Sequence, residues 1–215
     1  LNAGLGNDTV QGQAGDDTLS GDGGDDVLAG DSVTVQFNAG VMTQVVSLTE
    51  LSGNDSITSG TGNSLLIGGN GNDTITAGNG RNFVLADHGV ITFTSGVATG
   101  IVVQETEFDG ADVVSSGTGN DAIGGGGGAD TITSGAGNDF VDASSGNDSI
   151  DAGDGDDVVN GNSGNDFAIG GTGNDVLNGG LDDDTLQGQA GLDTVNGDGG
   201  DDVLVGDSAG FVVSG

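Results

Sequence analysis

Aspartates that recur every nine residues are the first feature of this sequence that could do chemistry. The second half of the chain contains eleven of them: Asp112, Asp121, Asp130, Asp139, Asp148, Asp157, Asp166, Asp175, Asp184, Asp193 and Asp202. An aliphatic residue follows each by two places, and a glycine precedes each by two places except at Asp182. Such a strict period indicates a repeat architecture. A cation must neutralise these carboxylates before the chain compacts.

The composition supports a fold that is conditional on cations. The 215 residues include 34 acidic side chains and one arginine, and the formal net charge is −33. With 48 glycines and 3% aromatic residues, the chain resembles disordered segments in composition. The charge disfavours nucleic acid and anionic membranes as partners. No apolar stretch is long enough to insert into a membrane.

Catalysis has little support in these residues. The chain has no cysteine, lysine or tyrosine, and its one histidine, His88, lies in no recognisable Ser-His-Asp arrangement. We therefore expect no enzymatic activity, and we place His88 in a surface loop. The lack of cysteine fits an extracellular protein without disulfides.

The repeating unit is G-G-x-G-x-D-x-U-x, where U is a large aliphatic residue. It occurs 18 times, and the aspartate place holds Asp in 16 units. The first two blocks of units contribute Asp8, Asp17, Asp26, Asp55 and Asp73, with Ser64 and Asn82 in the remaining two aspartate places. We expect repeat blocks at 1–31, 53–87 and 110–207, hairpin inserts at 32–52 and 88–109, and the start of a third insert at 208–215.

Each insert has two alternating strand patterns around a glycine, Gly40 or Gly96, and is predicted to form a β-hairpin. We expect Phe37 and Phe93 to anchor these hairpins by packing on the repeats. Residues 1–32 align with residues 177–208 with 24 identities. This duplication indicates a tandem array, and we treat the chain as a piece of a longer protein.

The repeating unit resembles the RTX (repeats-in-toxin, haemolysin-type) calcium-binding nonapeptide. The resemblance implies an all-β, right-handed parallel β-roll, a calcium-binding solenoid with 18 residues per turn. In each unit six residues would form a turn and three a short strand. The residues agree with this fold, because glycine permits positive φ in the turns. The x-U-x stretch would point one aliphatic side chain inward, so that these side chains stack into a narrow core.

Turns of this length place Asp112 and every second repeat aspartate after it on one edge, and Asp121 and its successors on the other. A cation between successive turns would contact two carboxylates and turn carbonyls. Flexible, all-oxygen sites suit Ca²⁺ better than Mg²⁺ or Zn²⁺. Pairs within blocks number eleven, and eleven Ca²⁺ ions would bring 22 positive charges, which would change the formal net charge from −33 to −11. All sixteen repeat aspartates are candidate ligands.

The exceptions lead to separate expectations. The Ser64–Asn82 pair is predicted not to bind calcium, or to bind it only through carbonyls. A further hypothesis is that Arg81 forms an intramolecular charge contact that replaces the missing ion. Asp182 either crowds its turn or supplies an extra ligand. Acidic residues just before a repeat aspartate are interpreted as turn formers: Asp16, Asp25, Asp156, Asp183 and Asp201.

The favoured function is a calcium-dependent structural module of a large secreted or cell-surface bacterial protein, such as an adhesin stalk, surface layer or filament. Copies of the module could join end to end. The alternative is the calcium-binding carboxy-terminal region of a secreted enzyme or toxin. Ice binding is a weaker hypothesis, since the row Thr118, Ala136, Asp154 and Thr172 is irregular. The resemblance also implies type I secretion, with folding when the chain meets external calcium.

Overall fold

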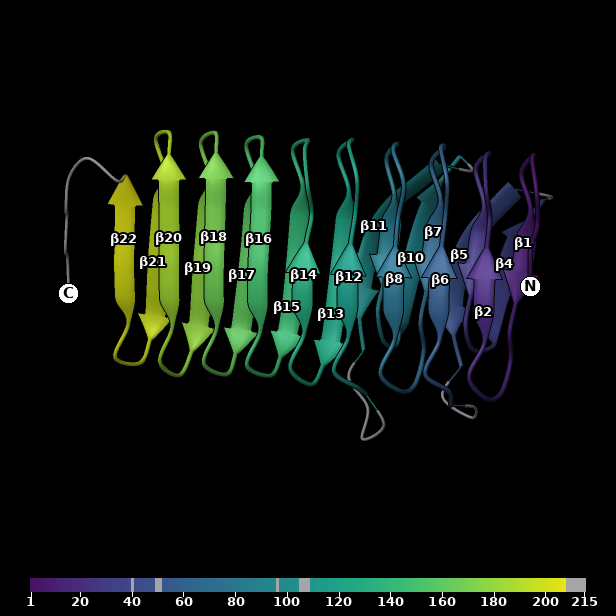
Figure 1. Cartoon of the computed structure of the whole chain (residues 1–215), viewed down its shortest axis with the longest axis horizontal. Helices are drawn as coiled ribbons and strands as arrows, with labels where there is room; N and C mark the ends of the chain where they lie inside the picture. The colour runs from purple at the N-terminus through teal and green to yellow at the C-terminus, as the bar shows by residue number, and fades with distance from the viewer. Residues whose placement is uncertain (40, 49–51, 96, 105–108, 208–215) are drawn as a thin grey trace.

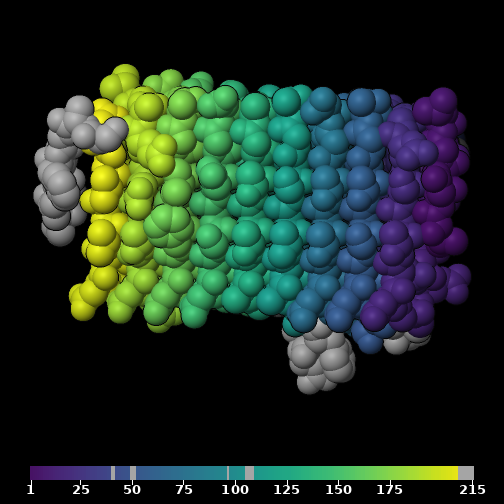
Figure 2. Space-filling model, viewed as in Figure 1, coloured from purple at the N-terminus to yellow at the C-terminus, as the bar shows by residue number. Residues whose placement is uncertain are grey.

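The computed structural model describes residues 1–39, 41–48, 52–95, 97–104 and 109–207. Within these ranges no helix is long and apolar enough to cross a membrane. The chain winds into a parallel β-solenoid whose turns lie side by side along the long axis (Figure 1). Figure 2 shows the turns in contact as parallel rows of side chains. The prediction of an all-β roll with 18-residue turns is confirmed.

One wall of the solenoid is a nine-stranded sheet made of odd-numbered strands, which we call the odd sheet. Each strand pairs in parallel with the strand one turn later, so that Val141 lies opposite Val159. In sheet order the strands are β1 (Thr9–Gln11), β3 (Val27–Ala29), β7 (Leu65–Ile67), β9 (Phe83–Leu85), β13 (Ala122–Gly127), β15 (Phe140–Ser145), β17 (Val158–Ser163), β19 (Val176–Leu181) and β21 (Thr194–Gly199).

The opposite wall is a nine-stranded parallel sheet of even-numbered strands, the even sheet. In order its strands are β2 (Thr18–Ser20), β6 (Ser56–Thr58), β8 (Thr74–Thr76), β12 (Val113–Ser115), β14 (Thr131–Thr133), β16 (Ser149–Asp154), β18 (Phe167–Thr172), β20 (Thr185–Ala190) and β22 (Val203–Asp207). The aliphatic side chain of each unit points between the two walls, as Ile123, Val159 and Leu177 do at 0% exposure. The predicted narrow aliphatic core is therefore present.

Most strands in the third block are longer than the x-U-x stretch predicts, although β12 and β14 keep three residues. In β16 and β18, pairing continues into the following unit, where Gly153 lies opposite Gly171 and Asp154 opposite Thr172. Roll strands of the first two blocks keep the expected three residues. In the longer strands the ladder runs on through glycines of the next unit.

The two inserts form a single antiparallel sheet rather than separate hairpins, which we call the hairpin sheet. Its order is β11 (Val97–Val103), β10 (Gly89–Thr94), β5 (Val41–Ser47) and β4 (Val33–Asn38). It covers the outer face of β3, β7 and β9, where Leu65 and Phe83 pack with Val45 and Ile91 in a second core. In Figure 1 it lies behind the N-terminal part of the roll.

Only one of the two phenylalanines that were expected to pack on the repeats is packed. Phe93 packs against the second core, whereas Phe37 is 62% exposed. Phe37 lies on β4 at the edge of the hairpin sheet, whereas Phe93 lies on β10, inside the sheet between β11 and β5. Gly40, Gly96 and the expected third insert at 208–215 lie outside the described residues.

Candidate metal sites

Two rows of aspartates run along the solenoid, one before the strands of each sheet. In the even row, Oδ1 of each aspartate accepts a hydrogen bond from the backbone N–H of the aspartate one turn earlier, as between Asp148 Oδ1 and Asp130 N at 2.8 Å. The even row consists of Asp17, Asp55, Asp73, Asp112, Asp130, Asp148, Asp166, Asp184 and Asp202. The odd row consists of Asp8, Asp26, Ser64, Asn82, Asp121, Asp139, Asp157, Asp175 and Asp193.

The even row is continuous across both inserts, which sequence spacing did not reveal. Asp17 N donates to Asp55 Oδ1 at 2.7 Å, and Asp73 N donates to Asp112 Oδ1 at 2.6 Å. These partners are 38 and 39 residues apart, because an insert of the hairpin sheet leaves the roll between them. The block-by-block count of eleven aspartate pairs therefore rises by two to thirteen.

The second carboxylate oxygen of these aspartates is buried without a hydrogen-bond partner. Among the described residues this holds for Oδ2 of fourteen row members: Asp8, Asp26, Asp55, Asp73, Asp112, Asp121, Asp130, Asp139, Asp148, Asp157, Asp166, Asp175, Asp184 and Asp193. Buried polar atoms are normally satisfied, and an unpaired carboxylate oxygen is costly. Because the same unpartnered Oδ2 atom recurs from turn to turn, it indicates that a bound cation is the missing partner.

The surroundings of these oxygens fit a calcium ion. A Cβ atom placed on Gly170 would lie 2.5 Å from Asp175 Oδ2 and 2.9 Å from Gly188 O, so these two oxygens converge beside the glycine. Asp130 Oδ2 and Ala143 O converge in the same way beside Gly125. No group of three or more Asp, Glu, His or Cys is placed to hold one ion in the described part of the chain. Backbone carbonyls must therefore complete each site, and such all-oxygen sets suit Ca²⁺.

Burial raises the pKa of most row aspartates between Asp26 and Asp184 in the ion-free protein. Desolvation is the largest cause, and neighbouring carboxylates add to it. The pKa of Asp112 is raised to about 8, those of Asp148 and Asp166 to about 7, and those of Asp130 and Asp139 to about 6. A cation held by the same oxygens would reverse this effect, because it stabilises the ionised form.

Without calcium, we expect the roll to become less stable as pH rises from about 4 to about 8. These carboxyls have folded pKa values above the unfolded value of 3.8, so the folded state binds more protons in that range. Their stabilising contribution is present below pH 4 and is lost as pH passes through the folded pKa values. Circular dichroism in a chelator across this range should show β-structure decreasing with pH. A β signal that grows with pH would contradict this expectation.

The Ser64–Asn82 pair is satisfied entirely by the protein. Asn82 Nδ2 donates to Gly78 O at 2.9 Å, to Gly80 O at 3.0 Å and to Asp121 Oδ1 at 3.2 Å. Asn82 Oδ1 accepts from Ser64 N at 3.0 Å. An amide nitrogen thus lies where aspartates of other units carry an unpartnered oxygen.

Arg81 does not form the expected charge contact. Its guanidinium lies over the ring of Phe83, 4.8 Å from the centroid, and no ion pair of Arg81 is found among the described residues. Its charge lowers the pKa of Asp121 only as a minor cause. The contact next to the missing carboxylate comes instead from the side chain of Asn82, because its amide hydrogens reach the turn carbonyls directly.

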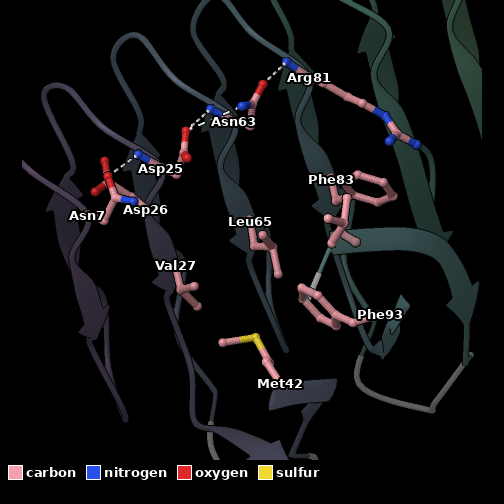
Figure 3. Close-up of a pocket in the computed structure, with 12 residues that line it drawn as sticks. Asn7, Asp25, Asp26, Val27, Met42, Asn63, Leu65, Arg81, Phe83 and Phe93 are labelled. Atoms are coloured by element: carbon pink, nitrogen blue, oxygen red, sulfur yellow. Dashed lines mark hydrogen bonds between the residues drawn. The ribbon is translucent and has the colours of Figure 1, made fainter. Parts of the chain in front are cut away.

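Residues just before the row positions form an outer ladder on the turns. Figure 3 shows Asn7, Asp25, Asn63 and Arg81 in sequence along this ladder. Asp25 N donates to Asn7 Oδ1 at 3.0 Å, Asn63 N to Asp25 Oδ1 at 2.8 Å, and Arg81 N to Asn63 Oδ1 at 2.9 Å. Either Asn or Asp can accept these bonds, which supports the interpretation of the acidic residues here as turn formers.

A cluster of ionisable side chains lies at the roots of the inserts, where sequence analysis assigned no role. His88 is 1% exposed rather than on a surface loop, and its Nδ1 is 3.0 Å from Asp109 Oδ1. Asp87 accepts from Gly110 N at 3.1 Å and Gly127 N at 2.9 Å, and burial raises its pKa to about 10. Asp31 and Asp87 replace the second glycine of their units and are 56 residues apart. This repeated substitution is the sequence feature that could have pointed to the cluster.

Asp182 occupies a turn position that otherwise holds glycine. Its φ is +76°, in the left-handed region that is unfavourable for residues with a Cβ atom. Its charge also raises the pKa of Asp166 and Asp184. The backbone is therefore strained at Asp182, and the choice between crowding of the turn and an extra ligand stays a prediction.

Comparison with known families agrees with this geometry. The sequence model of the RTX calcium-binding nonapeptide repeat (4 copies) matches residues 2–32, 51–84, 108–141, 133–168 and 169–204. No curated protein sequence matches the chain. The family matches cover well over half of the chain and coincide with the two aspartate rows, whereas the hairpin sheet falls outside them. This chain belongs to the RTX calcium-binding nonapeptide repeat family.

Proposed function

We propose that this chain is a calcium-rigidified structural module of a large secreted or cell-surface bacterial protein, such as an adhesin stalk, a surface layer or an extracellular filament. RTX repeats bind Ca²⁺ and are typical of secreted bacterial proteins. The observation that carries the proposal is the row of buried, unpartnered Oδ2 atoms along a continuous solenoid. Ions at these atoms would couple each turn to the next along the whole length.

The sixteen row aspartates are the residues that would hold calcium. In every row aspartate after the first of each row, Oδ1 already accepts a hydrogen bond from a neighbouring turn, which orients the carboxylate and leaves Oδ2 for the ion. The ion supplies positive charge between carboxylates that otherwise repel. Because external calcium is millimolar and cytosolic calcium is far lower, the chain would stay unfolded before export and fold outside.

The duplication of residues 1–32 at 177–208 supports a stalk or filament rather than a single appended module. Stacked repeats make long, quasi-one-dimensional objects whose length grows with copy number. The parallel edges of β1 and β22 lie at opposite ends of the roll, so further turns or further copies can extend it in both directions.

Small-angle X-ray scattering tests this role. In millimolar Ca²⁺ the radius of gyration is expected near or somewhat above the value of about 17 Å for a compact chain of this length. In chelator it should rise toward about 50 Å, the value for an unfolded chain. A scattering profile that is the same in calcium and in chelator would remove the basis for a calcium-rigidified module.

A further inference from the structure

The segment of the roll beneath the hairpin sheet differs from the rest in how the polar atoms of its turns find hydrogen-bond partners. In the odd row, Asp26 is followed by Ser64 and Asn82 before carboxylates resume at Asp121. Both replacements are buried, at 1% and 0% exposure. Neither carries a buried side-chain atom that lacks a hydrogen-bond partner, in contrast to the aspartates of the same row.

The amide of Asn82 does chemically what a cation does in the other turns. The turn carbonyls Gly78 O and Gly80 O are electron-rich acceptors that face the row side chain. Asn82 Nδ2 supplies hydrogens to both, and to Asp121 Oδ1. An ion in this place would instead need the second carboxylate oxygen that asparagine lacks. The turn is therefore closed by neutral hydrogen bonds.

The same turns, together with β3, have an apolar cover that the rest of the odd sheet lacks. The outward side chains of β7 and β9, including Leu65, Phe83 and Leu85, are at most 9% exposed beneath the hairpin sheet. On β15, beyond that cover, the outward Phe140 is 38% exposed. Because each fully buried large apolar side chain stabilises by about 1.5–3 kcal/mol, the covered turns have a source of stability that is independent of ions.

We propose that the roll segment formed by β7 and β9 under the hairpin sheet folds at calcium concentrations too low for the other turns, and is the nucleus to which calcium-loaded turns add in both directions. This inference rests on the proposed calcium dependence of the rest of the roll. Both odd-row positions without a carboxylate, Ser64 and Asn82, directly precede strands that lie under the hairpin cover, β7 and β9, so a second apolar core accompanies the loss of these ion ligands. Asp55 and Asp73 of the even row still need cations there, so this segment requires less calcium rather than none.

Amide hydrogen exchange across a calcium titration tests this directly. Equivalent inter-turn donors are Leu65 N and Phe83 N beneath the cover, and Val158 N and Val176 N beyond it; each donates to the carbonyl of a row residue. We expect the calcium midpoint for protection of the first two to be at least tenfold lower than for the last two, which corresponds to about 1.4 kcal/mol. Equal midpoints in the unmodified chain would overturn the proposal.

A substitution at Asn82 tests whether its side-chain amide is what lowers the calcium midpoint. Asn82→Asp replaces the donor nitrogen with an acceptor and should raise the midpoint for Leu65 N and Phe83 N at least tenfold, toward that of Val158 N. Asn72→Asp is the matched control, since it adds the same charge at an exposed outer-ladder position that Asp also occupies elsewhere. The control should leave the midpoint within about twofold of the unmodified chain.

The outcomes distinguish this proposal from the proposed function. If no amide in the chain gains protection with calcium, the calcium-rigidified module itself is wrong. If Val158 N and Val176 N need calcium and Leu65 N and Phe83 N need the same concentration, only the nucleus is wrong. An Asn82→Asp variant that keeps the low midpoint would show that the amide does not replace the ion.

Discussion

Titrating calcium into the calcium-free chain is expected to convert it from coil to β-structure. Fourteen buried Oδ2 atoms lack partners among the described residues, and most of their carboxyl groups would be ionised at neutral pH in the unfolded chain. Folding without an ion would bury these charges unpaired, next to one another. Calcium removes that cost, so binding and folding should occur together.

Far-UV circular dichroism measures this transition, with Mg²⁺ as the control cation. We expect little response to Mg²⁺, because it demands tight octahedral geometry and gives up its water reluctantly, whereas these flexible carbonyl and carboxylate sets suit Ca²⁺. Adding a chelator to the folded protein should return the coil spectrum. An equal transition with Mg²⁺, or none with either ion, would show that the aspartate rows are not calcium sites.

The second large effect is expected at a turn glycine that faces the preceding turn. Gly146 has a φ of +141°, and a Cβ atom added there would overlap the carbonyl oxygen of Gly128. Gly146→Ala should therefore force two turns apart and strain the backbone. In saturating calcium we expect the free energy of unfolding to fall by about 3 kcal/mol or more.

Gly15→Ala is the matched control for this substitution. Gly15 holds the same place in its unit and also has positive φ, at +94°, but no atom lies within 4 Å of an added Cβ. Only backbone strain should remain, which costs about 1–2 kcal/mol. Chemical denaturation of both variants in calcium measures the difference. Equal losses at the two positions would mean that inter-turn contact at Gly146 does not limit the stacking.

Local repetition made much of the fold predictable. The nine-residue spacing of aspartate, glycine and aliphatic residues, together with the 18-residue turn that the resemblance to RTX repeats implies, predicted the two rows, the inward column that includes Ile123 and Val159, and the parallel stacking. These features depend on residues within one or two turns of each other. A strict period leaves few ways to bury one aliphatic and expose two neighbours in every unit.

Contacts between distant segments were not predictable from the period. The inserts appeared as two separate hairpins, but β5 pairs with β10, and together they bury a second core on the odd sheet. Burial of His88 and the exposure of Phe37 follow from that packing. The bond between Asp73 and Asp112 is equally invisible to a nine-residue count, because the insert changes the spacing to 39.

The duplicated segment shows most clearly which features the local sequence determines and which depend on the tertiary structure. Residues 1–32 and 177–208 are nearly the same sequence, and by itself that sequence determined the turns, the strands and the candidate ion ligands. Yet β3 lies in the odd sheet and its copy β22 in the even sheet. Val27 is 9% exposed beneath the hairpin sheet, whereas the equivalent Val203 is 55% exposed. Local sequence selects the shape of each turn, but the number of turns between copies and the hairpin sheet packed across them decide which wall a strand joins and whether its outer side chains are buried.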